Sequence, residues 1–440
     1  MKKDFPYFLF CFLLLLTAIV GCNEPKAMVM EETEILHQNQ DQLTQVIIYD
    51  VFTPPVASRI YVYSSLASYE AIRFSKQGAG SITGQLKGFG KMPLPEKGKT
   101  YNYTLAATKA FFTVARNIKV FSVDSLRASE QAVYKSFKDN INDTVYQRSV
   151  DFGDAVARQI LIRAKTDGYI KSRGKPKNIG SNDPGKWRPT PPDYMDGVEW
   201  CWNEMQPMLM DSAAQFKPVP PPPYSTDTAS LFFRSLKEVY NIGKNLTAEQ
   251  QLIARYWDDN PFVMEHSGHM MFGNKKITPA GHWMGIAAIA AKTTKADPVK
   301  TAKTYALTSI ALYDAFISCW DEKYRSNYIR PITVINEKID NRWAAFLQTP
   351  PFPEYTSGHS TITGAAATVL TGLYGDNFAF QDTSDLRYIG MQRHFSSFMQ
   401  AADEASISRV YGGIHYRFSV DEGARAGKKL GAMITKKILQ

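Results

Sequence analysis

Apolar residues recur every three to four positions along most of the chain, a spacing typical of helices that bury one face. In the first half this pattern predicts helices over residues 56–74, 103–118, 124–141 and 143–166. Residues 167–226 interrupt the pattern with many prolines and glycines, and we expect a long irregular segment there. Few stretches alternate between apolar and polar residues as strands do. The sequence therefore predicts an all-α fold.

Helix-start signals predict further helices in the second half. The periodic pattern returns near Asp227, and Thr247 precedes acidic and amide residues in the arrangement of a capped helix start. Asp297 followed by Pro298 predicts a helix that runs to about Trp320. Similar signals mark three later helix starts, at Ser357, near Ser384, and at Ser419 with Glu422 completing a capping box.

Two stretches of the chain resemble each other. Residues 61–72 align with residues 305–316, and five of the twelve positions are identical. Each stretch belongs to the first long helix of its half. Chance similarity between amphipathic helices could produce this match, and so could two related helical bundles. We expect two packed helical bundles, over residues 41–230 and 231–440.

The N-terminus has the layout of a secretory signal, with a basic start, an apolar run over residues 8–20, and then Gly21-Cys22. The ending resembles a bacterial lipobox, which predicts a lipoprotein signal peptide over residues 1–21 and a lipid on Cys22. Residues 22–40 are polar and predict a tether. A plain signal, or an anchor helix with a chance cysteine, is the alternative. We expect an exported protein held at the cell envelope only by its lipid, in the periplasm or at the outer membrane or cell surface.

Composition narrows the class of protein. The 440 residues are 44% hydrophobic, enough for a large packed core, which excludes a mainly disordered chain. Lys and Arg total 51 against 42 Asp and Glu, a net charge of +9. Because the basic residues form no run, this charge fits an anionic ligand better than a nucleic acid. Apart from the N-terminal segment only Cys201 and Cys319 remain, and we expect two buried free thiols, with a disulfide as the alternative.

Three short motifs in the second half contain side chains suited to an oxyanion. The first runs from Lys323 to Arg330, where Pro331 disfavours the α conformation of the arginine and predicts an extended segment. A lysine and a forked guanidinium at such a turn match a tetrahedral or trigonal oxyanion. Alone this motif is weak, because basic residues after a helix often only offset its dipole.

The other two motifs place histidines beside anion-binding groups. Ser357-Gly358-His359 stands at a predicted helix start, where free backbone N–H groups bind anions and a glycine lets a ligand come close, although an ordinary serine cap would look the same. Arg409 falls in the last turn of a predicted helix, and His415 lies on the short connector after two glycines. A histidine held this way beside an arginine indicates a site rather than core packing.

The order Lys-x6-Arg-Pro, Ser-Gly-His and Ser-Arg-x5-His resembles the signature shared by vanadium-dependent haloperoxidases and type-2 phosphatidic acid phosphatases. The motifs cover residues 323–415. The resemblance in helical pattern extends over most of the chain, including Pro54-Pro55 and the Pro-Ala-Gly-His-Trp stretch over residues 279–283. It implies the helical-bundle fold of these enzymes and a vanadate or phosphate site.

The resemblance also implies a role for each matching residue. His415 would bind the metal of vanadate, His359 would be the acid–base group, and Lys323 would help to activate peroxide. Trp320 and Phe352 would wall the halide side of the pocket. The residues that would bind the vanadate cofactor are Lys323, Arg330, Ser357, Gly358, His359, Arg409 and His415.

Vanadate and phosphate fit the same cradle, so other residues must separate haloperoxidase from acid phosphatase. The phosphatases of this family usually have an Asp four residues after the last histidine, where this chain has Ser419. Trp320 and Phe352 stand where haloperoxidases have their pocket walls, and the chain has no internal membrane span of the lipid-phosphatase kind. These features favour a haloperoxidase that uses hydrogen peroxide and halide. An acid phosphatase with a phosphohistidine at His415 is the alternative, and a non-catalytic oxyanion-binding lipoprotein is a more distant one.

Iodide is the expected halide, because it is the easiest to oxidise and the Tyr355-Thr356-Ser-Gly-His form resembles bacterial members that favour it. Thr356 replaces a common Pro, which predicts a less rigid start of the helix. The aromatic pair resembles that of chloride-oxidising relatives and argues for a broader range.

Four other histidines are expected to lie outside the catalytic set. His282 is expected to be structural, and His394 is expected to pack in the middle of a helix. His266 and His269 repeat the Ser-Gly-His letters without a partner motif nearby.

Overall fold

The structure, a computed structural model, describes residues 31–440 apart from 119, 139, 262, 268 and 274. Helices dominate these residues, and the strands among them form two short antiparallel ribbons, β1 with β2 and β3 with β4. The predicted all-α fold is confirmed.

The helices of the first half are α1 (Glu32–Tyr49), α2 (Pro54–Ile72), α3 (Tyr103–Asn117), α4 (Val123–Lys138), α5 (Asp143–Thr166) and α6 (Tyr169–Arg173), with short 3₁₀ turns at Arg73–Ser75, Thr83–Gln85 and Trp202–Glu204. Then follow α7 (Leu231–Lys244), α8 (Ala248–Tyr256), β1 (Met264–Ser267), β2 (Met270–Gly273), α9 (Pro279–Thr293), α10 (Pro298–Ser326) and α11 (Pro331–Lys338). The last elements are α12 (Gly358–Tyr374), β3 (Phe380–Asp382), α13 (Leu386–Ile389), β4 (Arg393–Phe395), α14 (Phe398–Tyr411) and α15 (Arg417–Ile438).

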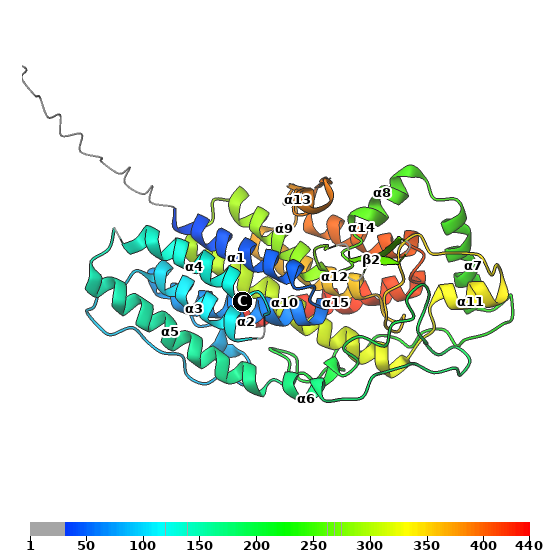
Figure 1. The fold of residues 1–440 in the computed structure, drawn as a ribbon, viewed down its shortest axis with the longest axis horizontal. Coiled ribbons are helices and arrows are strands. Elements are labelled where there is room, and N and C mark those ends of the chain that lie inside the picture. The colour runs from blue at the N-terminus through cyan, green and yellow to red at the C-terminus, as the bar shows by residue number, and fades with distance from the viewer. Residues whose placement is uncertain (1–30, 119, 139, 262, 268, 274) are drawn as a thin grey trace, which may run out of the picture.

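Helices α2 and α10 pack against each other near the middle of the molecule and join its two halves (Figure 1). On one side α2 packs on α3, which packs on α5. On the other side α10 packs on α12, which packs on α14 and α15. One cluster of buried apolar residues runs through both groups, from Leu36 in α1 to Ile434 in α15. The two halves therefore share a core, and the division near residue 230 stays a prediction.

The two similar stretches lie in α2 and α10, and an acidic side chain anchors a loop at the same position in each. Glu70 accepts the Thr83 N–H and the Ser81 hydroxyl, both at 2.9 Å. Asp314 accepts the backbone N–H groups of residues 208–210 at 2.7, 2.9 and 3.1 Å. Both carboxylates are buried. The second one holds the irregular segment against α10.

Several predicted helix starts are confirmed. Thr247 and Gln250 form a capping box at α8, and the Asp297 side chain accepts a backbone N–H at the start of α10. Helix α10 continues past the predicted end at Trp320 and stops at Asn327, which has a left-handed conformation with φ of 47°. This longer helix includes Lys323 in its last turn.

The prediction of a single helix from near Ser384 to Arg409 is wrong in its first part. The N–H and hydroxyl of Ser384 both bond to Asp382 Oδ1, at 3.1 and 2.6 Å, and the short α13 ends at Gly390, whose φ is 70°. The chain passes through β4 and starts again as α14, with Ser397 as its cap. His394 is therefore exposed on a strand and does not pack in a helix.

The capping box expected between Ser419 and Glu422 is also wrong. Helix α15 begins at Arg417, and the Ser419 N–H donates to the Tyr416 carbonyl at 3.1 Å. The serine is thus inside the first turn, and its hydroxyl points to the Glu354 carbonyl at 3.5 Å.

The predicted tether over residues 22–40 is wrong for residues 32–40. These residues belong to helix α1, and several of their polar side chains are buried. His37 Nδ1 lies 2.5 Å from the Tyr305 hydroxyl, and Asn39 donates to a threonine of α3 at 3.1 Å. Polar residues were expected to remain in solvent, but hydrogen-bonded polar groups can be buried at little cost.

The predicted signal peptide and lipidation site, Cys22, lie outside the described residues. Within the described part of the chain, no helix is long and apolar enough to cross a membrane. Cys201 and Cys319 are both free and buried, which confirms the expected thiols.

Candidate active site

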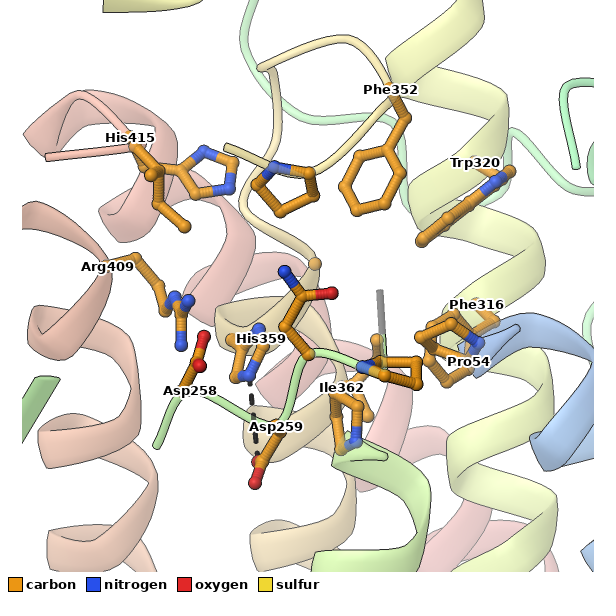
Figure 2. A pocket seen from close by; sticks show the side chains of 16 residues that line it. Pro54, Asp258, Asp259, Phe316, Trp320, Phe352, His359, Ile362, Arg409 and His415 are labelled. Atoms are coloured by element: carbon orange, nitrogen blue, oxygen red, sulfur yellow. Dashed lines mark ion pairs between the residues drawn. The ribbon is translucent and has the colours of Figure 1, made fainter. Parts of the chain in front are cut away.

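Three segments that are distant in sequence meet around one pocket (Figure 2). The end of α10 and the turn after it contribute Lys323 and Arg330, and the start of α12 contributes residues 357–359. The end of α14 and its connector to α15 contribute Arg409 and His415. All are buried except His359, which is partly exposed. Gly358, His359, Arg409 and His415 line the pocket, and Lys323, Arg330 and Ser357 lie directly beside these four, so the predicted cofactor-binding residues form one cluster.

The two buried arginines each keep a donor without an acceptor. Arg330 is extended as predicted, and its Nε and Nη1 donate to the carbonyls of Phe352 at 3.0 Å and Ile414 at 2.7 Å. Its Nη2 has no hydrogen-bond partner among the residues described. Arg409 Nη1 donates to the Trp257 carbonyl, whereas its Nε finds no acceptor in the same part of the chain. Burying such donors is costly unless an anion accepts from them, so the pair fits an oxyanion.

Burial sets the pKa values of this cationic group. It lowers the pKa of Lys323 to about 7 and that of Arg330 to about 10, and it also lowers the pKa of Arg409. Repulsion between the buried cations adds to the shifts of Lys323 and Arg330. A bound anion would favour the charged forms of all three.

The amine of Lys323 donates to three backbone carbonyls, those of Pro353 at 2.9 Å, Glu354 at 3.1 Å and Thr356 at 2.6 Å. It lies 5.0 Å from the centroid of the Phe352 ring. These bonds fix the segment that leads into α12. An anion at this amine would have to share or replace one of the three carbonyls.

The start of α12 offers donors and space. Ser357 caps the helix as predicted, because its oxygen accepts the Ser360 N–H at 3.3 Å and the Ser360 hydroxyl at 2.9 Å. A Cβ at Gly358 would meet its nearest neighbours, Trp320 and Lys323, at 3.7 and 3.9 Å, which are ordinary contacts. Packing therefore does not require a glycine here, and its missing side chain leaves room in the pocket for a ligand of the helix N-terminus.

His415 is held in one tautomer. Its Nδ1 lies 2.8 Å from Glu354 Oε1, and its Nε2 lies 3.2 Å from Arg330 Nη1. Because the guanidinium can only donate, Nε2 must be an acceptor, and Nδ1 therefore has the proton. Burial and the nearby cations lower the pKa of His415 well below its ordinary value. A neutral imidazole with an unprotonated Nε2 is the form that binds metals, and here the metal would replace the hydrogen bond from Arg330.

Sequence reasoning did not identify Glu354. It follows a run of prolines three residues before Ser357, and no spacing rule connects it with His415. Burial raises its pKa to about 7. Because Glu354 supplies a carboxylate to His415, the serine at position 419 no longer argues against a phosphatase.

His359 faces a carboxylate on its inner side. Its Nε2 lies 3.6 Å from Asp259 Oδ2, an ion-pair distance that is too long for a hydrogen bond, and the rest of the ring is turned toward the pocket (Figure 2). Burial, with the charge of Arg409 next, lowers the pKa of His359 to about 4. Asp259 was also missed in the sequence, where it is the second of two acids that follow α8.

Trp320 and Phe352 form the predicted aromatic wall, with ring centroids 5.0 Å apart. The Trp320 N–H donates to the Val198 carbonyl at 3.1 Å, so the irregular segment fixes the indole. Pro54, Phe316 and Ile362 also line this apolar part of the pocket. An apolar wall beside buried cations suits a small, weakly hydrated anion.

The histidines expected to lie outside the catalytic set differ in how far they are buried. His282 is fully buried among carboxylates, whereas His269 is exposed at the turn of the β1–β2 ribbon and His394 is exposed on β4. His266 lies on β1.

Comparisons with known proteins agree with this geometry. A sequence profile of the VCPO second helical-bundle domain matches residues 303–440. The vanadium chloroperoxidase of Curvularia inaequalis is 26% identical over a match that spans 27% of this chain and 28% of that protein. The crystal structure of the first bacterial vanadium-dependent iodoperoxidase superposes with a TM-score of 0.87 at 47% identity, covering 92% of this chain and 96% of that one. A holo-type bacterial vanadium-dependent chloroperoxidase shares the fold, with a TM-score of 0.68 at 18% identity over 89% of this chain and 93% of its own.

Proposed function

The chain belongs to the vanadium haloperoxidases, and from this premise we propose that it oxidises halide, with iodide favoured, using hydrogen peroxide and vanadate. One observation supports the proposal above all. Two buried guanidinium donors lack acceptors beside a neutral His415, whose unprotonated Nε2 would exchange its hydrogen bond from Arg330 for a metal.

In this proposal each residue has the role that its contacts allow. Nε2 of His415 would bind the metal, while Arg330 Nη2, Arg409 Nε and the Ser357 hydroxyl would donate to the oxygens. Vanadate supplies a Lewis-acid centre that activates hydrogen peroxide toward halide. His359 accepts the peroxide proton through the ring nitrogen on the pocket side, and it is neutral near pH 7 because its pKa is about 4.

Iodide selectivity is proposed from the relative that is 47% identical, which is an iodoperoxidase. The expected looseness at Thr356 does not contribute, because Thr356 is buried and its carbonyl accepts from Lys323 at 2.6 Å. Iodide is also the halide that needs the least activated oxidant.

The acid phosphatase alternative keeps one specific support. The Glu354–His415 pair holds Nε2 unprotonated and oriented, as a nucleophilic imidazole would need.

One experiment separates the two functions. The purified protein is reconstituted with orthovanadate, and initial rates of peroxide-dependent oxidation are measured for iodide, bromide and chloride. A vanadate-free sample is tested for hydrolysis of p-nitrophenyl phosphate. We expect iodide oxidation to exceed bromide oxidation clearly, with negligible chloride oxidation. A chloride rate equal to the iodide rate contradicts the proposed preference for iodide. Hydrolysis of the phosphate ester without any halide oxidation contradicts the proposed haloperoxidase function.

We also propose that the protein is an exported lipoprotein attached through Cys22, on the support of the apolar run and lipobox at its N-terminus. Expression of the full chain in a bacterial host should place it in the membrane fraction, and Cys22→Ser should prevent lipid labelling. Equal lipid labelling of the two proteins would contradict the proposal.

A further inference from the structure

His282, in the first turn of α9, lies behind the pocket among three buried carboxylates. Its Nδ1 lies 3.0 Å from Asp259 Oδ1 and 3.6 Å from Asp385 Oδ2, and its Nε2 lies 3.1 Å from Asp382 Oδ2. The imidazole is fully buried. The parallel ring of Trp257 stacks on it at 4.4 Å. The ring therefore has a fixed orientation.

The two nitrogens of His282 both face carboxylate oxygens at hydrogen-bond distance. A neutral imidazole can donate from only one nitrogen, so the other would face a carboxylate without a proton between them. The imidazolium donates at both, and the surrounding carboxylates raise the pKa of His282 against the effect of burial. His282 is thus a buried cation paired on both sides.

Asp259 connects this cation to the pocket. One of its oxygens faces His282 at 3.0 Å, and the other faces His359 Nε2 at 3.6 Å, the ion pair drawn in Figure 2. These residues form an array that runs from Asp382 through His282 and Asp259 to His359. The end of this array away from the pocket is also fixed, because Asp382 accepts the N–H and hydroxyl of Ser384.

We propose that His282 is a positioning residue, which holds Asp259 ionised and aims its second oxygen at Nε2 of His359. The charge of an ionised Asp259, whose oxygen lies 3.6 Å from Nε2 of His359, favours a proton on that nitrogen, so the lone pair of His359 lies on Nδ1, the nitrogen that faces the pocket. This tautomer can take a proton from a substrate, whereas the other cannot. The catalytic part of this inference rests on the proposed function, but the array itself does not.

Two neighbouring groups affect the same array. Lys276 donates to Asp258, the residue before Asp259, at 2.5 Å. Asp258 therefore has its own cation and does not compete for His282. Burial raises the pKa of Asp385 to about 7, so this third carboxylate can be neutral while Asp259 is ionised. The charge of His282 is therefore balanced mainly by Asp259 and Asp382.

The first test uses the unaltered, vanadate-free protein. Ring ¹⁵N spectra of histidine-labelled protein near neutral pH, assigned with His282→Gln and His359→Gln, report the protonation of each nitrogen. We expect both nitrogens of His282 to be protonated, and His359 to be neutral with its proton on Nε2. A neutral His282, or a His359 proton on Nδ1, would overturn the inference.

The second test uses His282→Gln, which cannot be a cation. In the vanadate-free variant we expect His359 signals to show a mixture of tautomers. After reconstitution kcat for iodide should fall roughly tenfold, with KM for iodide little changed, because general-base alignment is lost while halide binding is not. Unchanged His359 signals would contradict the proposal.

His37→Gln is the matched control, since His37 is another buried histidine, which lies on α1 and pairs with Tyr305 of α10. It should lower stability without altering the His359 spectrum or kcat. If His282→Gln does not fold, the His359 signals of the unaltered protein, assigned with His359→Gln, still decide, because a proton on Nδ1 overturns the inference. If no halide is oxidised at all, the proposed function fails while the spectral result stands on its own.

A bound metal ion is the competing explanation, because Asp259, His282 and Asp385 offer ligand atoms within 4.8 Å of one another. Elemental analysis of the purified protein should find no stoichiometric divalent metal. If the protein contains one divalent ion per chain and His282→Gln loses it, the assignment of His282 as an imidazolium is overturned.

Discussion

Nδ1 of His415 donates to Oε1 of Glu354 across 2.8 Å, and the same oxygen accepts the Tyr416 N–H at 3.0 Å. The carboxylate therefore fixes both the ring and the connector on which the ring is mounted. Carboxylates behind metal-binding histidines fix the tautomer and raise the basicity of the other nitrogen. Glu354 is thus part of the support for the proposed metal ligand.

Replacement of this carboxylate tests its importance. Glu354→Gln should weaken vanadate binding by roughly 10–100-fold, because the amide supports His415 less strongly than a carboxylate does. Titration calorimetry with orthovanadate measures the dissociation constant. Glu322→Gln is the control, since Glu322 is a buried carboxylate of α10 paired with Arg325. Equal affinities in the two variants would contradict the role of Glu354.

The two site histidines should fail in different ways. His415→Ala removes the proposed metal ligand and should abolish vanadate binding, read as vanadium content after gel filtration. His359→Ala should retain vanadate through His415 and the cations but lose most turnover, by about 10²–10⁴-fold. Vanadium retained by the first variant, or full halide oxidation by the second, would show that these roles are misassigned.

The lowered pKa of His359 makes a prediction about stability without vanadate. The ordinary pKa of 6.5 falls to about 4 in the folded state, so between these values the unfolded chain binds a proton that the folded chain does not. The wild type should therefore lose roughly 3 kcal/mol more unfolding free energy than His359→Gln as pH falls from about 7 to about 4. Denaturant unfolding at several pH values measures this difference. Parallel pH curves for the two proteins would be the contrary result.

Asp314 should matter for folding rather than for chemistry. It accepts three backbone N–H groups from the irregular segment, and Asp314→Asn turns an amide donor toward some of them. Leaving buried donors unpaired should cost roughly 2–3 kcal/mol of unfolding free energy. Asp403→Asn, an exposed partner of Lys428, should change it by less than about 0.5 kcal/mol. A similar effect of both substitutions would contradict the anchoring role.

Local chemistry explains what the sequence could predict. Thr247, Asp297 and Ser357 cap helices because a short side chain reaches a backbone N–H three residues on, and this information is contained in a few adjacent residues. The motif residues could be found in the same way, since their order and spacing resemble those of a known family.

Long-range pairing explains what the sequence could not predict. Glu354 and Asp259 act on histidines that are far along the chain, and nothing in the adjacent residues distinguishes them from other acids. Residues 32–40 looked like a tether because their polar groups find partners only when α1 docks on α3 and α10. Near Ser384, hydrogen bonds to Asp382 outweigh the helical periodicity.

The three carbonyls held by Lys323 have a consequence for how this site can change. They belong to the segment that contains Glu354 and ends at Ser357, so one ammonium group sets the positions of the support of His415 and of the first donor of α12. Substitutions at Lys323, Glu354 and Ser357 should therefore not be additive, because the first already disturbs what the others contribute. A lineage that lost the lysine would gain little by keeping the other two. We expect these positions to be exchanged together in evolution, or not at all.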